Sequence, residues 1–164
     1  MDTYRAVVGK RDQRAFLDLP IPDEVLRRIL QAGRMTGSSK NVEPNRFVVI
    51  RERSLVAALA ATSAYARWLA RAAVVIVLVQ TRAHAFDAGR CAQNLMLAAW
   101  NDGIGSCPAH LPEAEVAALL GIPPDLSINR VIGFGHVDPE RARPPASVAR
   151  RRLPLTELVH WDRW

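Results

Sequence analysis

The fold is decided by residues 73–101, AVVIVLVQTRAHAFDAGRCAQNLMLAAWN. Residues 73–80 are a short run of aliphatic, mostly β-branched side chains, which predicts a buried strand. Residues 86–101 have helical spacing, and their small apolar side chains share one face: Ala88, Cys91, Ala92, Leu95, Ala98 and Ala99. Gly103 is placed to end this helix. An inner face this small predicts a central helix packed closely against its neighbours.

The flanking sequence adds further helices and strands on both sides of this pair. Apolar spacing predicts helices over residues 21–35, 54–70 and 112–120, and strands over residues 46–51, 104–108 and 129–135. These elements do not alternate strictly, and no GxGxxG follows the first strand, which disfavours a Rossmann domain. The pattern therefore predicts an α+β fold in which helices flank one central sheet.

Length and composition fit one domain, residues 1–164. A chain of 164 residues that is 49% hydrophobic can bury a core without disulfides or a structural metal. The N-terminus is charged, and the longest apolar run, residues 72–79, is far shorter than the roughly 20 residues of a membrane span. We therefore expect a cytoplasmic protein without a membrane partner. Cys91 and Cys107 lack CxxC spacing and the histidines are isolated, so no metal site is expected.

The charge of the chain points to an anionic ligand. The formal net charge is +6 and the pI is near 10.3, almost wholly from arginine, since Lys10 and Lys40 are the only lysines. A nucleic-acid reader usually shows one contiguous basic patch with aromatics between. Here the basic residues cluster at 10–14, 27–28 and 150–152, which suits a compact anion better. Nucleic acid is therefore not expected as a partner, and salt-sensitive binding to DNA or RNA would be its mark.

Four separated segments resemble the nitroreductase family of flavoproteins. They are KRDQRAF at 10–16, GSSKNVEPNRFVVI at 37–50, FDAGRCAQNLMLAAWNDGIGSCP at 86–108, and IGFGHVDPE at 132–140 with RRRLP at 150–154. Their order and spacing cover nearly the whole chain. The resemblance implies an α/β sandwich with a central, mostly antiparallel sheet, and a homodimer with two FMN sites at the subunit interface. It also implies a C-terminal arm, about residues 144–164, that crosses onto the partner.

Basic residues near both ends of the chain fit the phosphate of FMN. A phosphate dianion calls for arginine or lysine. By resemblance, the segment at 10–14 grips this phosphate through Lys10, Arg11 and Arg14. Arg150 and Arg152 would join them from the far end of the chain.

Two further matches concern the flavin ring. Ser38, Ser39 and Asn41 match a family loop that reaches the flavin of the other subunit. Arg67 matches, more loosely, a basic residue that neutralises the N1/O2 edge of the ring. Both roles are implied by the resemblance.

The end of the strand predicted over 104–108 matches a third part of the family site. Pro108, Ala109 and His110 fall where the family passes a strand end along the isoalloxazine, with a main-chain N–H directed at flavin N5. Because that donor is main chain, the side chain at position 110 is free to vary. His110 is accordingly the one candidate for a specific side-chain contact with substrate.

Three residues depart from the family pattern. Asp12 stands where the family commonly has a serine that donates to phosphate. A carboxylate ~4 Å from an anion is repelled by on the order of 4 kcal/mol at an effective dielectric near 20. Either Asp12 turns away to pair with an arginine and offers only its backbone N–H, or the cofactor is not FMN. Glu43 and Asn45 also replace the usual glutamine and tryptophan. The connection between Gln80 and Phe86 is short, so the site should be comparatively open.

The resemblance implies an NAD(P)H-dependent flavin oxidoreductase. Hydride would pass from NAD(P)H to flavin N5, and the reduced flavin would then reduce a nitroaromatic, quinone or similar small acceptor in the same place. The chain has no GxSxG elbow and no paired acidic motif, so no catalytic side chain is expected. The alternative is a flavin or deazaflavin binding protein of the same fold with little or no turnover. In that case Asp12, Glu43 and Asn45 reflect a changed ligand, and absorbance of the purified protein distinguishes the two.

Overall fold

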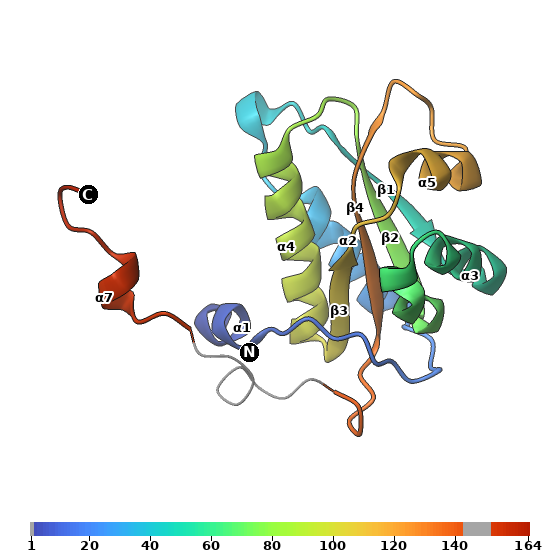
Figure 1. Cartoon of the computed structure of the whole chain (residues 1–164), viewed down its shortest axis with the longest axis horizontal. Coiled ribbons are helices and arrows are strands. Elements are labelled where there is room, and N and C mark those ends of the chain that lie inside the picture. The colour runs from blue at the N-terminus through green and yellow to red at the C-terminus, as the bar shows by residue number, and fades with distance from the viewer. Residues whose placement is uncertain (1, 143–151) are drawn as a thin grey trace.

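The computed structural model describes residues 2–142 and 152–164, and its centre is a four-stranded antiparallel sheet (Figure 1). The strands are β1 (Asn45–Ile50), β2 (Val74–Gln80), β3 (Ile104–Ala109) and β4 (Ser127–His136), in the spatial order β1-β2-β4-β3. Val77 in the middle of β2 faces Val48 of β1 on one side and Val131 of β4 on the other. The predicted α+β fold with a central antiparallel sheet is confirmed.

Helices cover both faces of this sheet. One face packs against α2 (Asp23–Arg34) and α4 (Ala85–Asn101). The other face packs against α3 (Arg53–Ala61), the 3₁₀ helix η2 (Ala64–Arg71) and α5 (Glu113–Leu120). Side chains of β2 alternate between the two cores, with Val75, Val77 and Val79 on the α3 side and Val74, Ile76 and Leu78 on the α4 side. Burial on both faces explains why the sequence of β2 is continuously apolar.

The central helix predicted from its small inner face is α4. It lies across the sheet and packs against α2, as Figure 1 shows. A Cβ atom added at Gly33 of α2 would lie 2.7 Å from Leu95 Cδ2 of α4. Glycine is therefore required where the two helices cross, because a larger residue would push them apart.

The segment that follows α1 (Thr3–Gly9) is joined to the edge strand β3. Asp12 forms a parallel bridge with Ser106, and the Gln13 N–H donates to the Ser106 carbonyl at 3.0 Å. Phe16 lies over the neighbouring strand, where a Cβ added at Gly135 would come within 2.8 Å of its ring. These contacts fix the basic residues 10–14 beside β3.

Two local features differ from the expectation. The helix predicted over residues 54–70 is divided into α3 and η2, because Ser63 adopts an extended conformation with φ of −147°. The helix α1 was not predicted, and none of its residues is buried. A short 3₁₀ turn, η1 (Ser39–Asn41), also lies in the loop expected between α2 and β1.

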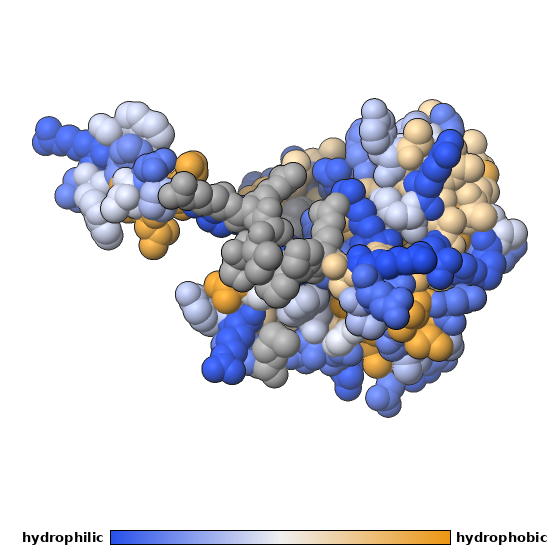
Figure 2. Space-filling view, turned by 60° about the horizontal axis from the view of Figure 1, so that its bottom comes forward, coloured by the Kyte–Doolittle hydropathy of each residue, from blue (hydrophilic) through white to orange (hydrophobic). Residues whose placement is uncertain are grey.

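The C-terminal segment stands apart from the sheet and its helices. It contains α7 (Leu155–Leu158), which Figure 1 places on the far side of α1 from the sheet. Every residue from 152 to 164 is exposed, and Figure 2 shows apolar side chains on the projecting segment. None of the described helices is both long and apolar enough to cross a membrane.

Candidate functional site

The predicted phosphate-binding segment lies against β3 and the C-terminal half of α4. The Lys10 side chain is 8% exposed, and its ammonium pairs with the Asp12 carboxylate. Lys10 Nζ also lies 3.4 Å from Met96 Sδ of α4. Asp12 therefore turns away to pair with a neighbouring cation, as one of the two sequence alternatives required, but the partner is a lysine and not an arginine. The reason is that Lys10 folds inward along Met96 and comes to lie beside Asp12.

Beside this segment lies a cavity of about 380 Å³, within the roughly 300–1,000 Å³ range of small-molecule sites. Its lining comes from the basic segment, η2 and the end of β3: Arg14, Ser63, Tyr65, Ala66, Trp68, Pro108, Ala109, His110 and Pro112. The Arg14 guanidinium lies 5.8 Å from the centre of the Trp68 ring. A cation and a flat aromatic surface therefore meet at one wall of the cavity.

Cys107 lies behind Arg14. Arg14 Nε donates a hydrogen bond to Cys107 Sγ at 3.3 Å. Burial raises the pKa of the Cys107 thiol, and the Arg14 hydrogen bond only partly opposes this effect. The thiol is therefore protonated at neutral pH and acts as a neutral partner that orients Arg14.

Two buried polar atoms mark this region as suited to a ligand. Arg11 Nε and Ser106 Oγ have no hydrogen-bond partner among the described residues. Arg11 otherwise donates to the carbonyls of Val8 and Lys10, at 2.8 and 2.7 Å. An unsatisfied buried polar group costs about 1–3 kcal/mol. Donors beside Lys10 and Arg14 fit an anion such as a phosphate, so the residues present fit FMN.

The predicted flavin-contacting loop lies at the other end of α4. Lys40, Asn41 and Glu43 have φ of 52°, 52° and 48°, in the left-handed region that costs non-glycine residues about 1–3 kcal/mol each. Ser38 Oγ accepts a hydrogen bond from the Glu43 N–H at 2.9 Å. The Ser39 N–H donates to Asp87 Oδ2 of α4 at 3.0 Å. The strained conformation is therefore held by specific contacts.

The structure brings together some of the predicted site residues and separates others. Those gathered at the β3 edge and its cavity are Lys10, Arg11, Asp12, Arg14, Pro108, Ala109 and His110. Ser38, Ser39 and Asn41 lie with the N-terminal end of α4. Arg152 is in the exposed C-terminal segment, and Arg150 lies outside the described residues.

Arg67 does not line the cavity. It is exposed on η2, while its neighbours Ala66 and Trp68 face the cavity. Trp68, Ser106 and Cys107 were not among the predicted site residues. Trp68 stands beside the residue that the resemblance selected, and Ser106 and Cys107 directly precede Pro108, so proximity to matched positions was the available signal.

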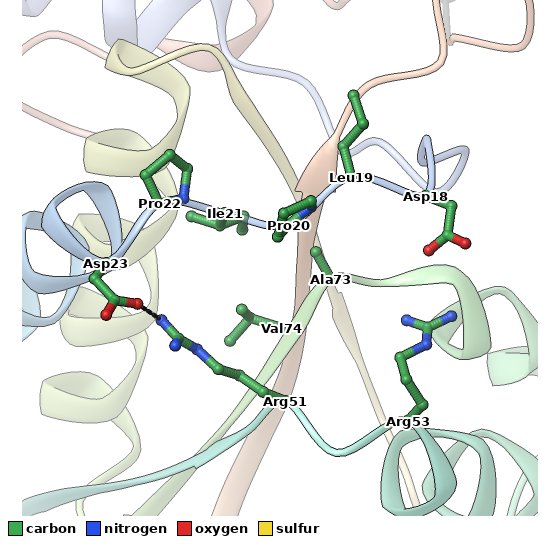
Figure 3. Close-up of a pocket in the computed structure, with 10 residues that line it drawn as sticks. All are labelled: Asp18, Leu19, Pro20, Ile21, Pro22, Asp23, Arg51, Arg53, Ala73 and Val74. Carbon is green, nitrogen blue, oxygen red and sulfur yellow. Dashed lines mark hydrogen bonds and ion pairs between the residues drawn. The ribbon is translucent and has the colours of Figure 1, made fainter.

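A larger cavity, of about 420 Å³, lies elsewhere, between residues 18–23 and the start of β2 (Figure 3). Its charged groups are already engaged with protein atoms. Arg51 donates to Asp23 at 2.6 Å and holds the pKa of that carboxyl below its usual value. Arg53 donates to the carbonyls of Ala72 and Ala70 at 2.8 and 2.9 Å. None of the predicted site residues lines this cavity, so the smaller cavity beside Arg14 is the better candidate.

A sequence model of the nitroreductase family matches two overlapping parts of the chain, residues 7–64 and 56–136. These ranges contain the basic segment, the loop at 37–44, α4 and the end of β3. The match therefore covers both parts of the candidate site.

Individual proteins are similar over nearly the same length. A protein of Archaeoglobus fulgidus, named as a candidate NADH dehydrogenase/NAD(P)H nitroreductase, is 25% identical over 153 residues, or 85% of this chain and 88% of the relative. The NADPH-flavin oxidoreductase of Vibrio harveyi is 27% identical over 185 residues, or 99% of this chain and 75% of that protein. The solved structure of an FMN-dependent nitroreductase from Clostridium difficile R20291 has the same fold. Its TM-score is 0.86 at 21% identity, with 99% of this chain and 100% of that chain covered.

Proposed function

This chain belongs to the nitroreductase family of oxidoreductases, and from that premise we propose that it binds FMN and uses NAD(P)H to reduce a small acceptor. Nitroaromatic compounds and quinones are the acceptor classes proposed. The observation that carries the proposal is the cavity in which Arg14 and Trp68 face residues 108–110, next to a basic segment with an unsatisfied buried donor on Arg11.

Three groups of residues would hold the cofactor. Lys10, Arg11 and Arg14 would bind the phosphate, since cationic donors are its preferred partners. The main chain at 108–110 and the Trp68 ring would lie along the isoalloxazine. When bound, FMN supplies hydride transfer, accepting two electrons from NAD(P)H and passing them to the acceptor.

The chain's own residues would bind, orient and shield. Arg14 provides positive charge at the cavity wall, held in place by Cys107 and Trp68. Ala66 and Trp68 provide an apolar wall that limits water. His110 is exposed at the rim and would contact the acceptor. Donor and acceptor would use this cavity in turn, which gives ping-pong kinetics.

We further propose a homodimer in which each subunit completes its partner's site. The loop carrying Ser38, Ser39 and Asn41 would reach the partner's flavin, and the arm at 144–164 would lie on the partner's surface. Support comes from exposed apolar side chains on α1 and the C-terminal segment, including Tyr4 at 76%, Leu155 at 74% and Trp161 at 85% exposure. Large exposed apolar surfaces mark association sites. The cytoplasm, where NAD(P)H is available, is the compartment proposed.

The flavin content of the purified protein tests the proposal. We expect a yellow protein that releases non-covalent FMN on denaturation at close to one per chain, and that oxidises NADH or NADPH when an acceptor is added. A colourless protein that takes up neither FMN nor FAD would overturn the flavoprotein assignment.

A second candidate function is binding of a deazaflavin with little nitroreductase turnover. The observation in its favour is the Asp12 carboxylate, which places negative charge inside the proposed phosphate site. Uptake of a deazaflavin but not of FMN would select this function. Because Lys10 pairs with Asp12 and offsets its charge, we favour FMN.

A further inference from the structure

We propose that Asp87 is a positioning residue for the partner subunit's flavin, acting through the loop that carries Ser38, Ser39 and Asn41. This inference rests on the proposed function, in which that loop serves a flavin in the second copy. Asp87 would not touch the flavin. It would set the backbone conformation in which the loop presents its polar side chains.

The contacts of Asp87 are directed away from its own helix. Its side chain is 2% exposed, although it lies in the first turn of α4. One carboxylate oxygen, Oδ2, accepts the Ser39 N–H at 3.0 Å and lies 3.2 Å from His84 Nδ1. The other oxygen lies 4.0 Å from an Arg90 nitrogen. A carboxylate in this position commonly serves the free N–H groups of its helix, whereas this one holds another segment.

The loop needs an external contact at its tip. Its base is tied down on both sides, since Asn94 donates to Thr36 Oγ1 at 2.8 Å and the Thr81 N–H donates to the Pro44 carbonyl at 3.0 Å. Between these ties the backbone has positive φ at Lys40, Asn41 and Glu43. The Asp87 hydrogen bond to Ser39 enters directly before this strained stretch.

Arg90 supports the same arrangement from the next turn of α4. Its guanidinium lies 5.6 Å from the centre of the Phe86 ring. A Cβ added at Gly37 would be 3.2 Å from an Arg90 terminal nitrogen, so the loop passes close to this side chain. The start of α4 therefore forms a platform on which the loop rests, with Asp87 as its hydrogen-bonding centre.

This platform is remote from the phosphate grip of the same chain. Lys10 contacts Met96, nine residues after Asp87 on α4, which is roughly 14 Å along the helix at about 1.5 Å per residue. Figure 1 shows η1 beside one end of α4 and the segment after α1 beside the other. The two parts of the proposed site are therefore separated in one chain and would meet across the dimer.

Two variants of Asp87 test the positioning role by flavin titration. Asp87→Ala removes the acceptor of the Ser39 N–H, and we expect the Kd for FMN to rise about 10-fold or more, as for loss of a hydrogen bond to a charged group. Asp87→Asn keeps one oxygen acceptor and should lie between the wild type and the alanine variant. Because the loop residues are neutral, riboflavin and FMN should lose affinity equally. Glu24→Gln, a first-turn acid of α2, is the matched control and should bind as the wild type does.

Mixed dimers test whether Asp87 acts on the partner's site. A dimer of one Asp87→Asn chain and one Arg14→Ala chain, isolated with two affinity tags, would have one unaltered site and one site with both defects. We expect half of its sites to bind FMN with wild-type affinity, which neither variant homodimer does. If the loop serves its own chain, every site carries one defect, no wild-type sites appear, and the proposal is overturned.

The two levels of the proposal fail in different ways. If the wild-type protein binds no flavin, the proposed function is wrong. If the wild type binds FMN but neither Asp87 variant changes its affinity, the function stands and the positioning role is wrong. Should Asp87→Ala fail to fold, Asp87→Asn carries both measurements.

Discussion

The strand β2 and the C-terminal segment at 152–164 are both rich in apolar side chains, yet their surroundings are opposite. In β2 every residue is buried, and the side chains of Val75, Ile76 and Val77 are 0% exposed. In the C-terminal segment every residue is exposed, with Trp164 at 99% and Leu155 at 74%. One chain therefore satisfies the first region and leaves the second uncovered.

The difference separates two uses of apolar surface. Burial of β2 between two helical layers stabilises the fold, at about 25 cal/mol per Å² of apolar surface removed from water. Apolar residues of the C-terminal segment contribute nothing of this kind while exposed. On the proposed dimer they contribute to assembly, and through assembly to the flavin site.

Removing the C-terminal segment should give the largest effect. Truncation after Pro145 is expected to abolish both the dimer and FMN binding, because the arm at 144–164 supplies the intersubunit contact. The secondary structure should persist, since both hydrophobic clusters lie within residues 16–134. Sedimentation velocity, flavin titration and far-UV circular dichroism measure the three properties. A truncated dimer that still holds FMN would break the comparison.

Matched leucine truncations should distinguish the two regions next. Leu78→Ala in β2 removes a side chain that is 0% exposed and should lower the free energy of unfolding by about 2–5 kcal/mol at every protein concentration. Leu155→Ala should change the unfolding of dilute protein by no more than about 0.5 kcal/mol but weaken the dimer. Urea unfolding at several protein concentrations checks both. Similar losses at low concentration would mean that the arm packs on its own chain.

The same comparison applies to charge. Arg14→Ala is expected to weaken FMN by about 1.5–3 kcal/mol and to leave riboflavin unchanged, because the lost contact is with the phosphate. Arg152→Ala should weaken FMN less, and only while the dimer persists, since Arg152 is exposed in the C-terminal segment. Isothermal titration with both ligands provides the measurement. Equal losses of riboflavin and FMN in Arg14→Ala would place the phosphate elsewhere.

Thiol labelling should give the smallest and most local effect. Burial raises the pKa of Cys91 to about 11 and also raises that of Cys107, so both native thiols should react slowly at pH 8. Their rates should rise with pH, because only the thiolate reacts. An introduced Leu155→Cys should react quickly in dilute protein and become protected as dimers form. Labelling of Leu155→Cys that does not depend on protein concentration would argue against the arm contact.

The sequence predicted the central elements because their patterns are strong. The strand β2 and the helix α4 begin within one residue of the expected positions, since a continuous apolar run and a small helical face leave few alternatives. The helix α1 was missed because it buries no residue and so carries no apolar stripe. The division at Ser63 was missed because both α3 and η2 are helical in composition.

The candidate site was predicted in outline but not in its contacts. Residues 10–14 and 108–110 meet as the resemblance implied, because the first segment bridges to β3. The exposed position of Arg67 and the inward position of Trp68 depend on how η2 turns, which composition does not specify. The Lys10 partner of Asp12 depends on the packing of Lys10 along Met96, a contact between residues 86 positions apart.

Sedimentation equilibrium of the FMN-loaded protein, monitored in the flavin absorbance band, tests the central claim most directly. The claim is that two copies of this chain form the flavin site together. The flavin should sediment with twice the 18.1 kDa mass of one chain, at one flavin per chain, and should be released as dilution dissociates the dimer. Flavin that sediments with a folded 18.1 kDa monomer would contradict the claim.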